Sequence, residues 1–286
     1  MKVFSSIQDT KNHLKNLKKE GKSFGFVPTM GALHAGHIAL IERAKKENDF
    51  VIASIFLNPL QFNDKKDLEK YPRTLEIDLE KLEKAGCDVV FNPSVEEMYP
   101  PSPLIDKERG MRGEVFDLEA LDKVMEGIQR PGHFQGVCAA VKKLFEIIEP
   151  DHAYFGEKDF QQLAVIKHMI KTLNIQVEII PCPTVREEDG LAMSSRNTLL
   201  GAEQRANAPH IYKTLIRAKE TQGTVSQIKK WVKDQINSNP FMEMEYFEIV
   251  NAETLLPIHS VNDAKELRAC IAVKMGSVRL IDNIPF

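Results

Sequence analysis

Cysteine is scarce in this chain of 286 residues, and its four copies are widely separated. No two of Cys87, Cys138, Cys182 and Cys270 form a C-x-x-C pair. This spacing excludes the common zinc-binding and thiol-exchange motifs. We therefore expect four reduced, buried thiols.

A long apolar run is also missing. Hydrophobic residues make up 43% of the sequence, but no stretch approaches the roughly 20 apolar residues that a membrane-spanning helix needs. The polar, lysine-rich residues after Ser6 contain no apolar core of the signal-peptide type. We expect a cytoplasmic protein without a membrane-spanning segment.

Positive charge is not in excess either, because 38 Lys and Arg face 41 Asp and Glu, for a net charge of −3. A protein that binds the nucleic-acid backbone normally has a basic excess, so no nucleic-acid partner is expected. The lysines at 11–22 are interrupted by Leu14 and Leu17 at helical spacing. This pattern predicts the exposed face of an amphipathic helix.

Short runs rich in β-branched and aromatic residues alternate with helical patterns in the first two thirds of the chain. Strands are expected at residues 24–29, 50–57, 88–92, 152–155 and 176–182, and helices at 36–47, 73–85, 134–148 and 159–173. The alternation predicts an α/β fold with a doubly wound, mostly parallel, Rossmann-like sheet. Such sheets bind ligands beyond the carboxyl ends of their strands.

The pattern changes after Pro183. Helices are expected there at 202–221 and 225–237, followed by strands near 244–251, 269–275 and 278–281. We predict a first domain at 1–183 and a smaller α+β domain at 184–286 that closes over the active site. The proline-rich sequence of residues 99–103 (YPPSP) predicts a stiff, irregular loop.

The most informative stretch joins the first expected strand to its helix, at residues 27–37 (VPTMGALHAGH). Gly31 and Gly36 allow the backbone to approach a ligand closely. A helix that begins near Gly36 offers unpaired N–H groups and a positive dipole end to an anion. His34 and His37 share one face of its first turn, because they are three residues apart. Two imidazole donors there suit a triphosphate that gains charge during displacement.

Other readings of this stretch are possible. An H-x-x-H pair is also half of a zinc site, although no third ligand stands in a matching motif, or it is two unrelated surface histidines. An NAD-dependent dehydrogenase is disfavoured, because Gly31 and Gly36 do not form a G-x-G-x-x-G motif.

With its flanking strand and helix, the His34-Ala35-Gly36-His37 motif resembles the signature of the nucleotidyltransferase superfamily, which includes class I aminoacyl-tRNA synthetases. Five later segments resemble motifs of the pantothenate synthetase family, in family order: residues 56–62 (FLNPLQF), 71–74 (YPRT), 130–134 (RPGHF), 154–163 (YFGEKDFQQL) and 186–197 (REEDGLAMSSRN). The resemblance extends over about residues 27–200, and the chain is identified as a member of this family.

Two alternatives remain within the superfamily. The first is an adenylate-forming enzyme for another acid, against which the segments around Gln61 and Gln162 argue. The second is a nucleotide-binding regulator without activity. That reading would require damage at His37, Lys158 or Arg196, and all three are present.

The resemblance implies an AMP-forming ligase of pantothenate and coenzyme A biosynthesis. Such enzymes condense (R)-pantoate with β-alanine through a pantoyl adenylate and release AMP and pyrophosphate. ATP is then a substrate, accompanied by Mg²⁺, and a homodimer is expected.

The resemblance also assigns residues to roles. Catalysis is assigned to His37, His34, Lys158 and Arg196. Because a carboxylate nucleophile needs no deprotonation at neutral pH, we expect His37 to act mainly as a hydrogen-bond donor to developing charge. ATP binding is assigned to Met30, Gly31, Ala32, Leu33, His34, Ala35, Gly36, His37, Gly156, Glu157, Lys158, Asp159, Val185, Met193, Ser194, Ser195 and Arg196. Pantoate is assigned to Gln61, Gln162, Met30 and Phe62, and β-alanine to Gln61.

Two residues have competing interpretations. Asp78 is our candidate magnesium ligand, directly or through water, and a solvated aspartate on a helix face is the alternative. Ser194, which begins the Ser-Ser pair, is equally suited to capping a helix.

Overall fold

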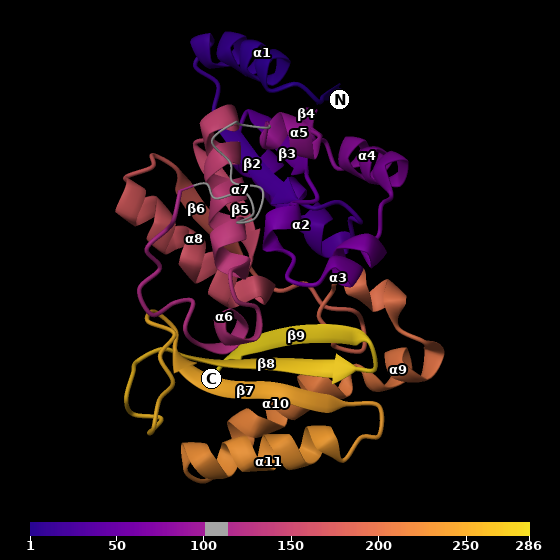
Figure 1. Ribbon diagram of the computed structural model, residues 1–286, viewed down its shortest axis with the longest axis vertical. Coiled ribbons are helices and arrows are strands. Elements are labelled where there is room, and N and C mark those ends of the chain that lie inside the picture. Colours follow the sequence, from indigo (N-terminus) through magenta and orange to yellow (C-terminus); the bar gives the residue numbers. More distant parts are fainter. Residues whose placement is uncertain (101–113) are drawn as a thin grey trace.

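The computed structural model describes residues 1–100 and 114–286, which fold around two sheets (Figure 1). The expected loop at 99–103 lies partly outside the described residues. The larger sheet has six strands, and each pair of neighbours in it is parallel. The smaller sheet has three antiparallel strands. The predicted α/β class, with a smaller α+β part, is confirmed.

The larger sheet has the strand order β1-β4-β3-β2-β5-β6. Its strands are β1 (Lys2–Phe4), β2 (Phe24–Thr29), β3 (Phe50–Ile55), β4 (Val89–Phe91), β5 (His152–Gly156) and β6 (Glu178–Cys182). All five expected strands are present. The sequence analysis missed β1, because three residues are too few for a periodic pattern; β1 forms by pairing with β4.

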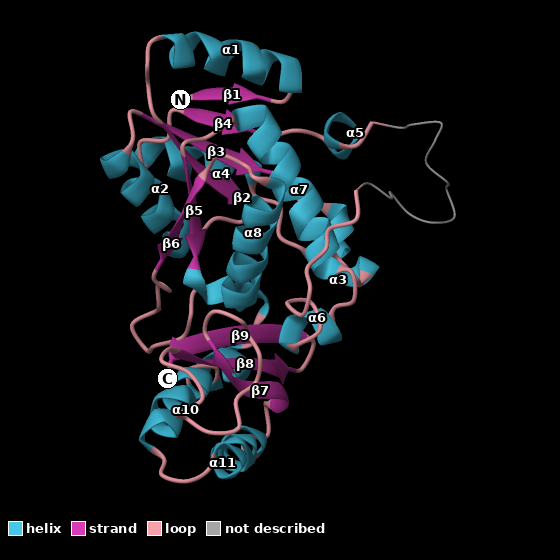
Figure 2. Cartoon of the chain, turned by 90° about the vertical axis from the view of Figure 1, so that its left-hand side faces the viewer, coloured by secondary structure: helices cyan, strands magenta, loops and turns pink. Residues whose placement is uncertain are grey.

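Helices cover both faces of this sheet (Figure 2). One face carries α1 (Ile7–Lys19), α7 (His133–Ile148) and α8 (Phe160–Leu173), and the other carries α2 (Ala35–Glu47) and α4 (Leu75–Lys84). Successive strand residues supply opposite cores: Phe24 and Phe26 pack under α7, whereas Val27 packs under α2. Burial on both faces explains why these strands are almost wholly apolar.

The C-terminal part packs helices on one face of the smaller sheet. The sheet comprises β7 (Glu243–Asn251), β8 (Leu267–Met275) and β9 (Val278–Pro285), with α10 (His210–Glu220) and α11 (Val225–Asn237) against it (Figure 1). The prediction of a single helix over 202–221 was wrong. The chain forms α9 (Ala202–Asn207) and then α10, because Pro209 lacks an N–H and clashes with the preceding turn.

Short elements complete the described chain. They are η1 (Pro59–Gln61), α3 (Lys65–Lys70), α5 (Val95–Met98), α6 (Met125–Gln129), η2 (Glu157–Asp159) and η3 (Ser195–Leu199). Within 1–100 and 114–286, no helix is both long enough and apolar enough to cross a membrane.

The direction of the connections reverses between β2 and β5. From β2 the chain continues to β3 on one side, and from β5 it continues to β6 on the other. The carboxyl ends of the two strands, at Thr29 and Gly156, therefore open a crevice between them. Ligands bind at such a point in open α/β sheets.

The position of η1 against α7 requires a glycine, which gives a test of this packing. A Cβ added at Gly136 would collide with the carbonyl of Leu60. We expect Gly136→Ala to lower the free energy of unfolding by about 1–3 kcal/mol, as overpacking does. Alanine normally stabilises a helix interior relative to glycine, so the sign is diagnostic.

Urea denaturation measures this effect. The control is Gly156→Ala, where φ is −72° and an added Cβ meets nothing within 4 Å. A Gly136→Ala protein as stable as the wild type would contradict the packing of η1 on α7.

Candidate active site

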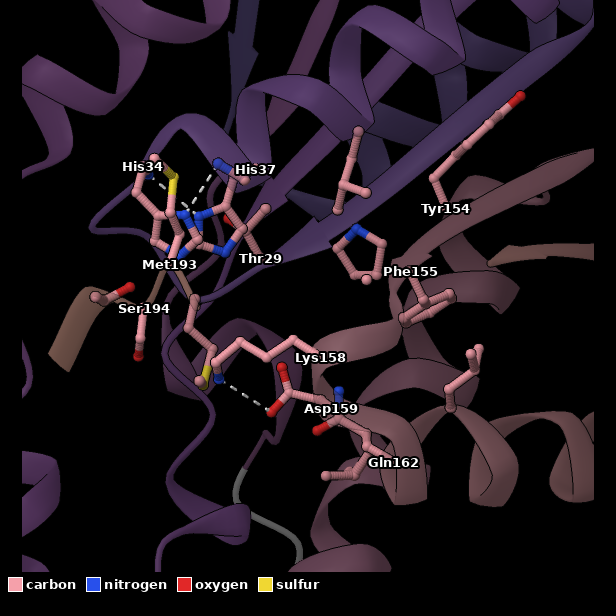
Figure 3. Close-up of a pocket in the computed structure, with 18 of the residues that line it drawn as sticks. Thr29, His34, His37, Tyr154, Phe155, Lys158, Asp159, Gln162, Met193 and Ser194 are labelled. Atoms are coloured by element: carbon pink, nitrogen blue, oxygen red, sulfur yellow. Dashed lines mark hydrogen bonds and ion pairs between the residues drawn. The ribbon is translucent and has the colours of Figure 1, made fainter. Parts of the chain in front are cut away.

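A cavity of about 210 Å³ occupies the crevice at the carboxyl ends of β2 and β5. Its walls come from the turn after β2, from η1, from the middle of α7, from the start of α8, and from the segment 183–196. Figure 3 shows the imidazoles of His34 and His37 side by side, with Lys158 and Asp159 on another wall. Segments far apart in the sequence therefore meet in one cavity.

The two histidines begin α2. His34 is the N-cap residue, and its Nδ1 accepts from the amide of Gly36 at 3.1 Å. The amide of His34 in turn donates to Nδ1 of His37 at 3.3 Å, and the ring centroids are 4.0 Å apart. Because both Nδ1 atoms accept backbone N–H groups, each ring carries its proton on Nε2. Both imidazoles thus present an N–H donor.

The charge state of these rings follows from their surroundings. Burial, reinforced by the cation of Lys158, lowers the pKa of His34 to about 4. Burial also holds the pKa of His37 well below its usual value, and His34 and Lys158 add to the effect. Both rings are therefore neutral donors near pH 7.

Gly36 is required by this geometry. A Cβ at this position would lie 2.9 Å from ring atoms of His34. Any other residue would push the imidazole away from the helix terminus, so the glycine of the motif serves the histidine before it.

A buried carboxylate fixes the turn before the helix. Asp78 on α4 is fully buried and accepts from the amides of Ala32 and Leu33, each at 2.8 Å, and from the hydroxyl of Thr74 at 3.1 Å. These bonds hold Ala32 in a left-handed conformation, with φ of 50°, that a non-glycine residue rarely adopts. The solvated helix-face interpretation of Asp78 was wrong. Its three donors favour positioning of the turn over the expected binding of magnesium.

The opposite wall begins where β5 ends. Lys158 lies in η2, with Nζ 3.8 Å from Oδ1 of Asp159. The side-chain amide of Asn283 on β9 donates to the carbonyls of Glu157, at 3.0 Å, and Lys158, at 2.8 Å. Arg268 on β8 binds the carboxylate of Glu157 at 3.0 Å. The smaller sheet thus holds the backbone that carries Lys158.

The segment after β6 forms a third wall. Ser194 caps η3 by accepting from the amide of Arg196, as the capping interpretation predicts, and it also lines the cavity. The hydroxyl of Ser195 donates to the carbonyl of Ala32 at 3.0 Å, which links this wall to the histidine turn. Arg196 forms an ion pair with Asp67 at 2.9 Å. A phosphate bound by Arg196 would replace or share this partner.

Gln61 and Gln162 reach the same cavity from η1 and α8. The amide nitrogen of Gln61 contacts Sδ of Met30 at 2.9 Å, and its oxygen accepts from Asn58 at 3.1 Å. Asn58 is almost completely buried and also donates to the carbonyl of Gly136 at 2.9 Å. The sequence analysis gave Asn58 no role, although this asparagine precedes Pro59 within the 56–62 segment.

Phe62 was expected to line the apolar side of the cavity, but the cavity walls do not include it. It packs edge-on against Tyr71 with ring centroids 5.8 Å apart. The reason is local: η1 ends at Gln61, and the extended residue that follows points to the other side. The apolar wall is instead formed by Phe56, Val137, Ala140, Val141 and Leu144.

The structure gathers most of the expected residues. Besides the two glutamines, the cavity is lined by Met30, His34, Gly36, His37, Gly156, Lys158, Asp159, Val185, Met193, Ser194, Ser195 and Arg196. The expected ATP-binding residues outside its walls are Gly31, Ala32, Leu33 and Ala35, which shape the turn, and Glu157, whose side chain faces Arg268. Lining residues without an expected role include Thr29, Tyr71, Tyr154 and Thr184. No spacing in the sequence distinguishes these four from core residues.

Comparisons with known proteins show the family of this chain. Residues 2–285 match the family model described as pantoate-beta-alanine ligase. The pantothenate synthetase of Porphyromonas gingivalis is 50% identical over 288 residues, which cover 100% of this chain and 99% of that protein. The corresponding protein of Bacteroides fragilis is 51% identical at the same coverage.

Solved structures are similar over the whole chain. The crystal structure of pantothenate synthetase from Thermus thermophilus has a TM-score of 0.90 and 42% identity, covering 99% of each chain. The ligase of Francisella tularensis, described as complexed with beta-gamma ATP and beta-alanine, has a TM-score of 0.81 and 35% identity, and covers 100% of this chain and 97% of that one. The chain belongs to the pantoate-beta-alanine ligase family.

Proposed function

We propose that the cavity at the carboxyl ends of β2 and β5 is where this chain carries out the reaction of its family. The chain is an ATP-dependent ligase that joins (R)-pantoate to β-alanine through pantoyl adenylate, in pantothenate and coenzyme A biosynthesis. One observation supports the location above all others. Neutral histidine donors and Lys158 share the cavity with two glutamine amides, so phosphate chemistry adjoins a site for a small hydroxy acid.

The first step breaks a bond at the α-phosphate of ATP. A carboxylate oxygen of pantoate attacks this phosphorus, and pyrophosphate leaves with the electrons of the broken P–O bond. The Nε2–H groups of His34 and His37 and the cation of Lys158 stabilise the charge that develops on the phosphates. No general base is needed, because the pantoate carboxylate is already ionised at neutral pH.

The second step needs dry surroundings. The amine of β-alanine attacks the acyl carbon of pantoyl adenylate, and AMP leaves. Gln61 and Gln162 hold the pantoyl hydroxyl and carbonyl groups, since an amide both donates and accepts. The apolar wall of Phe56, Val137 and their neighbours accommodates the dimethyl group and excludes water from the mixed anhydride.

Mg²⁺ is proposed to arrive with ATP. The described residues contain no group of three or more His, Cys, Asp or Glu side chains arranged to hold a metal ion. This arrangement of side chains fits an ion held mainly by phosphate oxygens and water, which is the usual way in which proteins bind Mg²⁺ with nucleotides. The ion would supply neutralising charge to the phosphates.

The wider organisation is also a proposal. Residues 1–183 would bind the nucleotide and pantoate, and residues 184–286 would close over the cavity through Met193 and Ser194. A homodimer in the cytoplasm, with ATP, pantoate and β-alanine as its small-molecule partners, remains our expectation.

The role of His37 can be tested directly. We expect His37→Ala to lower the single-turnover rate of pantoyl adenylate formation by about 10²–10³, the usual effect of losing one preorganised donor. His259→Ala, which removes an exposed histidine, is the matched control and should react at the wild-type rate. An unchanged rate in His37→Ala would refute the proposed role.

The pH dependence of adenylation follows from the lowered histidine pKa values. A histidine with its ordinary pKa of about 6.5 would protonate between pH 8 and 6. The lowered pKa values keep His34 and His37 neutral over this range, so the single-turnover rate should stay constant. An inflection near pH 6.5 that disappears in His34→Gln would contradict the neutral pair. Circular dichroism at each pH verifies that the fold is intact.

Asp78→Asn separates positioning from metal binding. The new amide cannot accept from both backbone N–H groups, so the turn loosens, and KM for ATP should rise about tenfold. The Mg²⁺ concentration for half-maximal activity should stay unchanged. Glu76→Gln, on the exposed face of the same helix, is the control. A shifted Mg²⁺ requirement with a normal KM for ATP would instead make Asp78 a metal ligand.

A further inference from the structure

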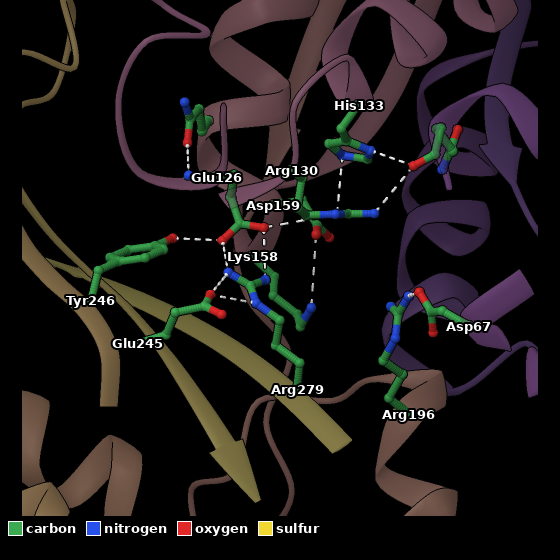
Figure 4. Close-up of polar contacts among 12 residues, drawn as sticks. Asp67, Glu126, Arg130, His133, Lys158, Asp159, Arg196, Glu245, Tyr246 and Arg279 are labelled. Atoms are coloured by element: carbon green, nitrogen blue, oxygen red, sulfur yellow. Dashed lines mark hydrogen bonds and ion pairs between the residues drawn. The ribbon is translucent and has the colours of Figure 1, made fainter. Parts of the chain in front are cut away.

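A buried glutamate joins the two sheets beside the cavity. Glu126 on α6 accepts from Arg279 on β9 through both carboxylate oxygens, at 2.7 and 2.8 Å, and from the hydroxyl of Tyr246 on β7 at 2.8 Å (Figure 4). Burial alone would raise the pKa of Glu126, but Arg279, together with Tyr246 and Arg130, outweighs it and lowers the value. The carboxylate therefore stays ionised and is fixed by the smaller sheet.

Arg130 continues the contact toward the cavity. Its guanidinium lies 3.8 Å from Glu126 and donates to Nε2 of His133 at 3.2 Å. It also donates to the backbone carbonyl of Gln61 at 3.3 Å. His133 places its Nδ1 2.8 Å from that same carbonyl. One carbonyl thus faces two donors from the 130–134 segment.

The chemistry of the partners settles the state of His133. A guanidinium only donates and a carbonyl only accepts, so Nε2 accepts from Arg130 and Nδ1 donates to Gln61. Burial, with Arg130 nearby, lowers the pKa of His133 to about 4, which agrees with a neutral ring. This tautomer is opposite to that of His34 and His37.

Gln61 is consequently fixed at both ends. Its carbonyl is held by Arg130 and His133, and its side-chain amide contacts Asn58 and Met30. We infer that Glu126, Arg130 and His133 form a positioning relay that lets the smaller sheet set the orientation of Gln61 toward pantoate. The relay rests on the proposed role of Gln61 and deepens it.

The relay residues position Gln61 and do not touch the substrates themselves. None of the three lines the main cavity. They line a neighbouring space of about 30 Å³, shared with Lys158 and Asp159. A space of this size holds about one or two waters and is too small for a substrate. Among the described residues, the side-chain hydrogen bonds that link them to a wall of the main cavity end at the carbonyl of Gln61, so we expect their effect on the reaction to pass through Gln61.

Glu126→Gln tests the relay, because it keeps the shape and removes the charge that anchors Arg130 and Arg279. We expect KM for pantoate to rise about tenfold, KM for ATP to change less than about twofold, and kcat to fall less than KM rises. If Glu126 had only a structural role, its replacement would weaken the binding of pantoate and of ATP to the same extent. Arg279→Lys, at a residue that lines neither cavity, should shift KM for pantoate in the same direction by a smaller factor.

The control variant is Glu248→Gln. Glu248 lies on β7 of the same small sheet and forms an ion pair with Lys229 of α11 at 2.6 Å. It has no contact with the relay. Its removal should leave both KM values unchanged. Thermal unfolding of each variant is measured alongside, and if Glu126→Gln does not fold, Arg279→Lys carries the test.

A double-mutant cycle identifies the route of the effect. In the Gln61→Ala background, Glu126→Gln should change KM for pantoate by less than about twofold, since the side chain it positions is gone. Independent, multiplicative effects would overturn the relay, and so would a parallel rise in KM for ATP.

Nitrogen NMR of His133 separates failure of the relay from failure of the site assignment. Its ¹⁵N shifts should report a neutral Nδ1–H ring from pH 8 to 6, and an Nε2–H or protonated ring would overturn the relay whatever the kinetics. If Gln61→Ala leaves KM for pantoate unchanged, the assignment of Gln61 is wrong and the relay falls with it, even where the NMR result holds.

Discussion

The pairing of β2 with β5 is the constraint on which the site depends. These parallel strands end side by side, so the histidine turn after β2 and the lysine after β5 must face one crevice. Parallel strands place every carboxyl end at the same edge of the sheet, and the reversal of connections between the two keeps helices out of the space between them. The proposed phosphate donors, at positions more than 100 residues apart, are thereby held by the backbone rather than by flexible side chains alone.

Neutrality of the two histidines is the electrostatic counterpart of this arrangement. A charged imidazole would bind phosphate more strongly in the ground state, but it would need both ring nitrogens as donors. The amides of His34 and Gly36 occupy the Nδ1 positions, which forbids that state without breaking the start of α2. In the proposed reaction, Lys158 would provide the permanent charge, and the rings would supply oriented donors to the charge that grows on the leaving pyrophosphate. Catalysis in this proposal thus relies on preorganised donors more than on proton transfer.

The sequence predicted whatever is encoded within a few neighbouring residues. The five main strands and the helix that begins at the histidine motif follow from local patterns, and about half of the cavity-lining residues follow from the family motifs. The carboxylate partner of the turn does not, because Asp78 reaches Ala32 across 46 residues. Likewise, the link from Arg279 to Glu126 spans 153 residues, and only the packed sheets bring the two together. The break at Pro209 is different: proline ends a helix for a local reason, and the helical periodicity was given too much weight.

The smaller sheet is therefore more than a cover for the cavity. Asn283 and Arg268 hold the backbone at Lys158, Arg186 on the third wall is fixed through a two-point ion pair with Asp282, and the relay from Arg279 ends at Gln61. Lys158, the segment after β6 and Gln61 are thus linked, directly or through the relay, to the same small sheet. A reaction that must first use ATP and then exclude water from a mixed anhydride gains from such a common support. Displacement of the whole sheet would disturb the proposed nucleotide and pantoate sides together, whereas loss of one contact, such as the relay, would affect its own side.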